Sequence, residues 1–295
     1  MTRSVASRRV IDSHLHLWDL DVSKYAWNGP QLGALNANFT PEMAWSELST
    51  AGVEGAVLVQ ADDTAEDTRF MLDAAASNRW VLGVVGWVPL EQPAAAEQAL
   101  DELLDHPVFC GVRHLLHNDP RDDYLALSSV RKSASLLAAR GLALDIPDAW
   151  PRHLKSTADL AAALPDLTVV VDHMGKPPRD DDHAFAQWHD AIKQVARQPN
   201  TVAKFSGLRM AGAEFTTEAL RATWEIALEL FGPDRLMYGG DWPMTVPDGG
   251  YQSTFEVQLE LIEQLTQPEQ HQLLAGTATR VYQLPTHRTL AADQQ

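Results

Sequence analysis

The sequence predicts a single-domain α/β protein in which eight parallel strands close into a (β/α)8 barrel. Short β-branched and apolar runs alternate along the 295 residues with longer Ala-, Leu- and Glu-rich stretches of helical period. A doubly wound sheet would show the same alternation. The count of eight strands favours the barrel, and so do the polar residues that follow the strands, where barrel enzymes place their chemistry.

The predicted strands are short apolar runs, several nearly continuous, as expected for strands buried on both faces of a parallel sheet. In chain order they occupy residues 9–13, 55–60, 81–87, 108–113, 142–146, 168–172, 201–206 and 235–240. The predicted helices lie between them, at residues 65–78, 92–105, 128–140, 154–163, 183–197, 216–230 and 253–265. No linker rich in Gly, Pro or Ser divides the chain, so residues 1–295 form one predicted domain.

The longest departure from the alternation is an insertion at residues 17–50, between the first two predicted strands. It contains several aromatic residues, including Tyr25 and Trp27, and a segment that starts with Pro41. An insertion of this size predicts a lid or substrate loop. A structural cover that uses the aromatic residues for packing is the equally weighted alternative.

Composition limits the classes of partner. The 40 acidic residues outnumber the 23 basic ones, which gives a net charge of −17 at pH 7. The negative electrostatic potential of such a protein repels nucleic acid and anionic membranes, so we expect neither as a partner. We expect a small-molecule substrate instead. The sequence leaves open assembly into a homo-oligomer.

The single cysteine, Cys110, excludes an intrachain disulfide framework and a cysteine-rich zinc site. Because it lies in the apolar run VFCGV, we expect a small buried apolar residue. The chain shows neither a signal-peptide core nor an apolar stretch long enough to cross a bilayer, so the predicted location is the cytoplasm.

The most specific local signal is the pair His14 and His16 at the end of the first predicted strand. Residues two apart in an extended segment point to the same side, so both imidazoles face the barrel mouth. Two neighbouring imidazole nitrogens suit a divalent metal. Two exposed histidines on a strand would give the same pattern.

Two more strand ends add matching groups. The sixth predicted strand is followed by His173 and the eighth by Asp241, which comes after the glycine pair Gly239 and Gly240. Glycines allow close approach of the backbone. Three histidines and one carboxylate at the carboxyl ends of barrel strands converge on one volume, so we expect them to form one site.

These motifs, H-x-H, DHMGKP and YGGDWP, resemble those of the amidohydrolase superfamily, specifically its lactonase-like group, which includes sugar lactonases and a 2-pyrone-4,6-dicarboxylate lactonase. The similarity extends over nearly the whole chain. It is carried by six segments in the same order, at residues 57–72, 84–90, 110–120, 169–178, 202–208 and 236–243.

The resemblance implies a role for each matching residue. His14, His16, His173 and Asp241 match the metal-ligand positions, with His173 and Asp241 also catalytic. In that superfamily the aspartate accepts a proton from the attacking water. A bridging lysine at the fourth strand is missing here, because that place reads Val112-Arg113-His114. We therefore expect one divalent metal, zinc, or none, since the group contains zinc enzymes and metal-independent ones.

The predicted substrate-binding residues come from several strand ends and loops. Arg113 and His114 match a fourth-strand motif that could hold the lactone carbonyl or a substrate carboxylate. The remaining candidates are Gln60 after the second strand, Tyr25 and Trp27 in the insertion, and His153 after the fifth strand. The context of His153 slightly favours the alternative that it begins the next helix.

Lys204 and Ser206 of the seventh strand point the same way, into the pocket or into a core layer. A core position for Lys204 requires a carboxylate partner.

The function expected from the resemblance is hydrolysis of a small lactone by a water that Asp241 activates. A decarboxylase of the same superfamily would use the same histidines and aspartate, but the residues of the segments GVRHLLH and YGGDWP favour the lactonase. A non-catalytic ligand-binding barrel is the third reading. The Asp241 carboxylate argues against this reading. Removing a carboxylate from water costs desolvation free energy, and a site that needs no proton acceptor gains nothing in return.

Overall fold

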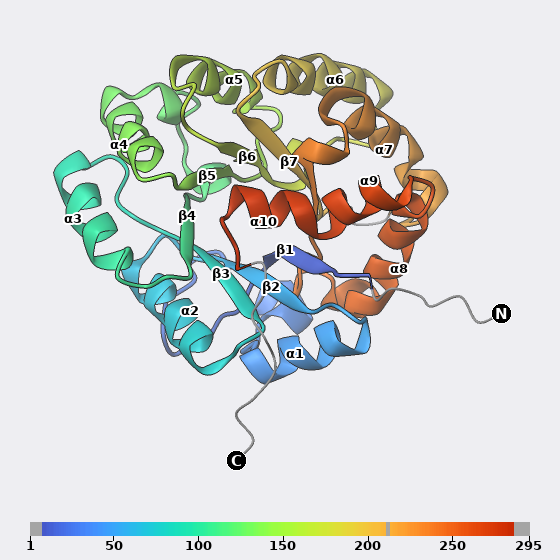
Figure 1. The fold of residues 1–295 in the computed structure, drawn as a ribbon, viewed down its shortest axis with the longest axis horizontal. Helices are drawn as coiled ribbons and strands as arrows, with labels where there is room; N and C mark the ends of the chain where they lie inside the picture. Colours follow the sequence, from blue (N-terminus) through green and yellow to red (C-terminus); the bar gives the residue numbers. More distant parts are fainter. Residues whose placement is uncertain (1–7, 211–212, 286–295) are drawn as a thin grey trace.

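The computed structural model describes residues 8–210 and 213–285 and confirms the predicted barrel (Figure 1). Eight parallel strands form one sheet in chain order, from β1 to β8. They are β1 Ile11–Leu15, β2 Gly55–Val59, β3 Val81–Gly86, β4 Phe109–Arg113, β5 Ala143–Ile146, β6 Val169–Val171, β7 Thr201–Phe205 and β8 Leu236–Tyr238. Backbone hydrogen bonds from His16 N to Trp242 O (2.7 Å) and from Asp241 N to His14 O (2.8 Å) join the end of β1 to the segment after β8.

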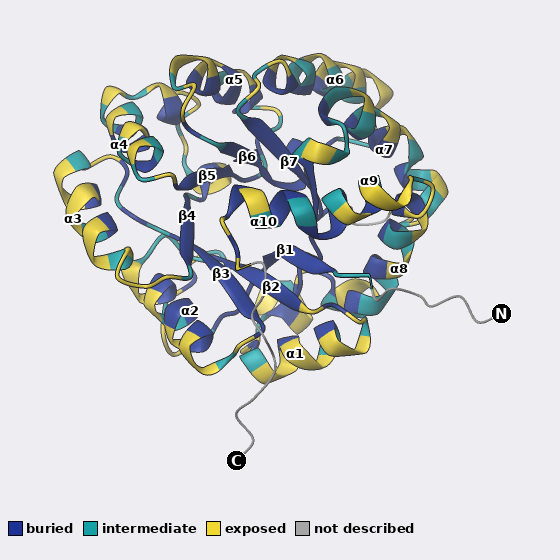
Figure 2. Ribbon diagram, viewed as in Figure 1, coloured by how far each residue is buried: buried dark blue, intermediate teal, exposed yellow. Residues whose placement is uncertain are grey.

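Helices surround the sheet, with their inner faces buried and their outer faces exposed (Figure 2). They are α1 Pro41–Thr50, α2 Ala65–Ser77, α3 Pro93–Leu103, α4 Ser128–Ala139, α5 Leu154–Ala163, α6 Asp182–Ala196, α7 Thr217–Phe231, α8 Gly250–Ile262, α9 Gln267–His271 and α10 Thr277–Val281. Local sequence fixes several starts: the Thr64 and Thr216 hydroxyls accept hydrogen bonds from the first turns of α2 and α7. Each predicted strand agrees with the structure within two residues, and each predicted helix within three.

The barrel interior is closed at the amino-terminal end of the strands by the end of the described chain, where α10 lies across the sheet (Figure 1). Val57, Val85 and Val202 point inward and pack with Val281 and Tyr282. Cys110 is buried in the same cluster, as expected. This end is therefore sealed by apolar packing, and any site must lie at the opposite, carboxyl end of the strands.

The insertion is shorter than predicted, since residues 41–50 form α1, the regular helix between β1 and β2. The remaining segment, 17–40, contains a short helix at Pro30–Leu35 and packs tightly. The Trp18 ring makes edge contacts with Trp27 and Phe39, with ring centroids 5.2 Å and 4.9 Å apart. The aromatic residues of this segment thus serve packing, and Trp18 and Trp27 also reach the carboxyl end of the barrel.

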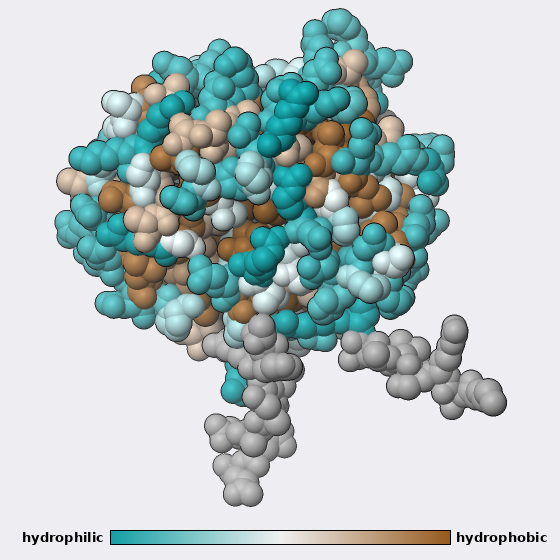
Figure 3. Space-filling view, turned by 45° about the horizontal axis from the view of Figure 1, so that its top comes forward, coloured by the Kyte–Doolittle hydropathy of each residue, from teal (hydrophilic) through white to brown (hydrophobic). Residues whose placement is uncertain are grey.

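The surface carries both hydrophilic and apolar residues. Hydrophilic side chains cover most of the face in Figure 3, with separate apolar patches between them. Within residues 8–210 and 213–285, no helix has the length and apolar character needed to cross a membrane.

Candidate active site

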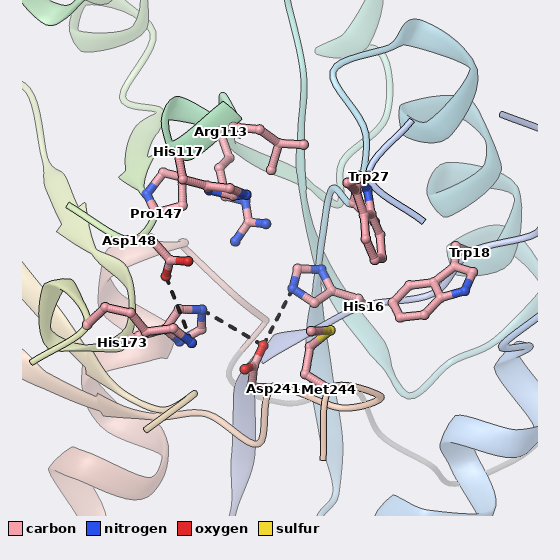
Figure 4. Close-up of a pocket in the computed structure, with 13 residues that line it drawn as sticks. His16, Trp18, Trp27, Arg113, His117, Pro147, Asp148, His173, Asp241 and Met244 are labelled. Carbon is pink, nitrogen blue, oxygen red and sulfur yellow. Dashed lines mark hydrogen bonds and ion pairs between the residues drawn. The ribbon is translucent and has the colours of Figure 1, made fainter. Parts of the chain in front are cut away.

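A pocket opens at the carboxyl ends of the strands (Figure 4). His16, His173 and Asp241 face its floor, and His14 lies fully buried beside them. We call these four residues the base.

Residues from loops surround the opening. Trp27 stands on one side, while His117 and Asp148 stand on the other (Figure 4). Lys176, from the loop after β6, also lines the pocket. We call these four residues the rim. Its side chains are partly or fully exposed, whereas every residue of the base is at most 5% exposed.

The base is a compact group centred on one carboxylate oxygen. Asp241 Oδ1 lies 3.6 Å from His16 Nε2 and 3.8 Å from both His14 Nε2 and His173 Nε2. The two Nε2 atoms of His14 and His16 are 3.1 Å apart. The structure therefore brings all four predicted ligand residues together, as expected from their positions at the ends of three strands.

Two glycines allow this convergence. A Cβ at Gly239 would lie 2.9 Å from the Cβ atoms of His14 and Ser206, and one at Gly240 would collide with the Tyr251 ring. Asp241 has a backbone φ of 56°, a left-handed conformation that aspartate tolerates better than most residues. The spacing of β8 from β1 thus depends on the absence of side chains just before Asp241.

Hydrogen bonds fix the orientation of two imidazoles. His16 Nδ1 lies 2.7 Å from Val59 O, and a carbonyl oxygen only accepts, so Nδ1 carries the hydrogen and donates. Nε2 of His16 is then directed toward Asp241 Oδ1, 3.6 Å away. His173 Nδ1 lies 2.9 Å from Ser206 Oγ, which leaves Nε2 directed toward Asp241.

Burial and charge set the protonation of the base. Burial lowers the pKa of His173 below its ordinary 6.5, so the ring is neutral at neutral pH. Burial alone would raise the pKa of Asp241, but the nearby His173, His16 and Lys176 hold it well below 3.8. Asp241 is therefore an ionised proton acceptor throughout the physiological range.

A layer of charges lies beneath the base, formed by Arg113, Asp145, Asp172 and Lys204; we call it the buried ion cluster. Lys204 Nζ lies 2.6 Å from Asp145 Oδ2 and 3.0 Å from Asp172 Oδ1. Arg113 Nη1 lies 3.1 Å from Asp172 Oδ2. Two cations thus neutralise two carboxylates, and Lys204 occupies the core position that required such a partner.

This cluster supports the base through His14. The ring nitrogen His14 Nδ1 lies 3.3 Å from Asp172 Oδ1 and 3.1 Å from Lys204 Nζ. Arg113 Nη1 approaches the other ring nitrogen, Nε2, at 3.2 Å. The cluster therefore holds the imidazole of His14 from both sides.

Two of the six predicted substrate-binding residues line the pocket, namely Arg113 and Trp27. Arg113 is only 5% exposed, and its guanidinium lies between Asp172 and the pocket. The Trp27 indole N–H donates to Ala61 O at 2.6 Å, which fixes the ring at the rim.

The other four predicted residues do not line this pocket. Tyr25 is fully buried, and its hydroxyl donates to Asp67 Oδ1 at 2.7 Å, so it anchors the 17–40 segment. Gln60 is also fully buried and donates to Asp63 Oδ1 at 2.8 Å. The Tyr25 hydroxyl and the Gln60 amide nitrogen are therefore engaged within the fold and not at the pocket.

The two remaining histidines are likewise held by their surroundings. His114 stacks on the Tyr124 ring, with centroids 4.4 Å apart, and its Nδ1 lies 3.1 Å from Asp63 Oδ2. His153 is 1% exposed and immediately precedes α5, where its carbonyl accepts from the Thr157 hydroxyl at 2.7 Å. The alternative in which His153 begins the next helix matches this position.

Sequence reasoning missed three polar residues of the pocket: His117, Asp148 and Lys176. Asp148 follows β5 by two residues, so the rule that polar residues at strand ends form the site would have found it. His117 and Lys176 lie four and five residues beyond β4 and β6, at a distance where the strand no longer fixes the direction of a side chain.

The base fits one divalent cation. Ligand atoms 2.0–2.1 Å from a tetrahedral zinc lie roughly 3.4 Å apart, and the His14 and His16 nitrogens are 3.1 Å apart. Ligand atoms of His14, His173 and Asp241 all lie within 4.8 Å of one another, the single such group within the described residues.

Comparison with known proteins identifies the family. A family model described as amidohydrolase matches residues 11–284. The chain belongs to this family. The amidohydrolase is 33% identical over 236 residues to an L-fucono-1,5-lactonase of Burkholderia ambifaria, which covers 80% of each chain.

A second relative covers more of the amidohydrolase. An L-fucono-1,5-lactonase of Burkholderia multivorans is 30% identical over 291 residues, which is 93% of this chain and 96% of that protein. The crystal structure of a Burkholderia multivorans amidohydrolase with bound zinc superposes with a TM-score of 0.84 and 28% identity, over 94% of this chain and 100% of the other. The resemblance inferred from the motifs is confirmed.

Proposed function

We propose that this amidohydrolase hydrolyses a small lactone, with Asp241 as the residue that activates water. The observation that carries the proposal is the ionised Asp241 carboxylate, centred among three imidazoles on the floor of the pocket. The two relatives described as L-fucono-1,5-lactonases support the same reaction class.

The reaction follows from the position of that carboxylate. A water beside Asp241 Oδ1 attacks the lactone carbonyl carbon while its proton passes to the carboxylate. The new C–O bond converts the carbonyl into a tetrahedral oxyanion. Because the base is nearly inaccessible to solvent, hydrogen bonds to this oxyanion are stronger there than in water.

The cationic side of the pocket can stabilise the oxyanion, since the Arg113 guanidinium lies there. When the tetrahedral intermediate collapses, the ring C–O bond breaks and its electron pair goes to the ring oxygen. Asp241 returns its proton to this alkoxide, which gives a hydroxy acid. The leaving group remains attached to the product, so the pocket needs no separate leaving-group site.

We propose that a single zinc ion, where bound, is held by His14, His16, His173 and Asp241. A zinc ion at this position lowers the pKa of bound water and polarises a carbonyl. Arg113 Nη1 already contacts His14 Nε2, so a cationic group stands beside the base in either case.

The metal content is a direct prediction. Elemental analysis of the purified protein should return one zinc per chain or none, because Arg113 stands where a bridging lysine would hold a second ion. Two tightly held ions per chain would contradict this account of the base.

The reaction class is tested by the products. A panel of five- and six-membered lactones and of aromatic acids is incubated with the protein in weakly buffered solution. We expect acid release from at least one lactone, since the new carboxylic acid ionises at neutral pH, and no carbon dioxide from any aromatic acid. Carbon dioxide release from an aromatic acid, without acid release from any lactone, would favour the decarboxylase reading.

A further inference from the structure

Asp148 is a pocket residue that the proposed mechanism does not use. It follows β5 by two residues and stands at the rim, opposite Trp27 (Figure 4). Its backbone φ of 41° lies in the left-handed region, which residues other than glycine rarely adopt. Such conformations concentrate at functional sites, where the surrounding structure maintains them.

The carboxylate of Asp148 lacks a hydrogen-bond donor. Its Oδ1 atom is buried and has no hydrogen-bond partner within residues 8–210 and 213–285. The nearest cation, Lys176 Nζ, is 4.0 Å away and donates instead to Gly207 O at 2.8 Å. The side chain as a whole is 30% exposed and lines the pocket, so the carboxylate keeps acceptor capacity that a ligand can use.

The charge of Asp148 limits what that ligand offers. Burial alone would raise its pKa, but Lys176, His173 and His117 hold the pKa below the ordinary 3.8. The ionised group is an acceptor only. A substrate hydroxyl can donate to it, whereas a substrate carboxylate at the same place would be repelled.

The opposite side of the pocket has a different chemistry. The Trp18 and Trp27 rings offer apolar faces, and the Trp27 N–H is already bonded to Ala61 O. A lactone ring with its carbonyl at the base therefore meets aromatic carbon on one side and the Asp148 carboxylate on the other. This asymmetry suits a ring that carries hydroxyl groups on one edge.

We propose that Asp148 accepts a hydrogen bond from a ring hydroxyl of the substrate and so selects polyhydroxylated lactones over unsubstituted and carboxylated ones. The assignment rests on the proposed lactonase function. A hydrogen bond to a charged group contributes enough to change kcat/KM by about 10- to 100-fold. Because the bond is already made in the ground state, the change falls mainly on KM.

The test measures acid release from three lactones: a polyhydroxylated 1,5-lactone, δ-valerolactone and 2-pyrone-4,6-dicarboxylate. With Asp148→Ala, we expect kcat/KM for the polyhydroxylated lactone to fall by about 10- to 100-fold through KM, and that for δ-valerolactone to change less than about 3-fold. Asp148→Asn tolerates the left-handed backbone and keeps one acceptor oxygen, so its loss should be smaller. Asp166→Asn, an exposed change in the loop before β6, is the matched control, and thermal unfolding of each variant checks the fold.

Each other outcome decides a different claim. An equal fall in kcat/KM for the hydroxylated and the unsubstituted lactone overturns the assignment of Asp148 but leaves the lactonase function intact. A wild-type protein that hydrolyses only the carboxylated lactone does the same. Silence of the wild-type protein toward all three lactones and the wider panel overturns the proposed function, and with it this assignment.

Discussion

The base and the rim of the pocket are built by different means. The base lies at the ends of strands, where backbone hydrogen bonds across the closed barrel fix His14 and Asp241 to each other. The rim comes from loops, and its side chains are held by local contacts such as Lys176 Nζ to Gly207 O and the Trp27 N–H to Ala61 O. The catalytic residues are thus held on the rigid strand ends, while the residues that select the substrate lie on loops that can vary. Other barrel enzymes show the same division, with variable loops on a conserved barrel.

The largest expected effect comes from the base. Asp241→Asn preserves the shape but removes the proton acceptor, so kcat should fall by about 10²-fold or more, with little change in stability. Steady-state acid release from the best lactone measures the effect, and Asp166→Asn is the control. Near-normal turnover in a folded Asp241→Asn protein would contradict the role of Asp241 as the proton acceptor.

The buried ion cluster should matter for stability more than any charge of the rim. Lys204→Met leaves Asp145 and Asp172 without their shared cation at positions that are 0% exposed. We expect a loss of about 3–5 kcal/mol in the free energy of unfolding, measured by urea denaturation. The matched variant Lys176→Met removes a lysine whose side chain is 38% exposed, and should cost at most about 1 kcal/mol. Equal losses would contradict the distinction between the cluster and the rim.

The anchor of the 17–40 segment should give the smallest effect, and it depends on pH. Burial raises the pKa of Asp67 to about 6, despite the hydrogen bond from the Tyr25 hydroxyl and that from Ala61 N. Asp62 is the other charge that faces it and also raises the pKa. The folded state thus binds a proton more readily than the unfolded state does, so the wild type loses stability as pH rises from about 4 through about 6.

Asp67→Asn removes this ionisation and keeps the shape of the side chain. Its stability relative to the wild type should therefore rise by about 1 kcal/mol between pH 5 and pH 8. Urea midpoints at several pH values measure the trend. A stability difference that stays constant, or that falls as pH rises, would show that Asp67 does not ionise as its burial implies.

The sequence was sufficient for the fold and the base because both depend on periodic strands. His14 lies in β1, where the alternation of inward and outward positions fixes its direction, and His173 and Asp241 follow β6 and β8 within three residues. Loops have no such period. The pattern therefore leaves Tyr25 and His153 among the substrate-binding candidates, although the structure uses Tyr25 as an anchor and buries His153 at a helix start.

The buried ion cluster was beyond sequence reasoning for a different reason. Asp172 stands next to His173 in a recognised motif, yet its partners Arg113 and Lys204 are 59 and 32 positions away in the chain. Only closure of the barrel brings these strands together. The sequence therefore required a carboxylate for Lys204 but could not name it.

The central claim, that water activated by Asp241 attacks the lactone carbonyl, is tested most directly by isotope labelling. The best lactone is hydrolysed in water enriched in oxygen-18, and the hydroxy acid product is analysed by fragment mass spectrometry. Attack at the carbonyl carbon predicts one labelled oxygen in the new carboxylate, none in the new hydroxyl group, and loss of enzymatic labelling with Asp241→Asn. Label in the hydroxyl group, or full labelling by the Asp241→Asn protein, would contradict the account.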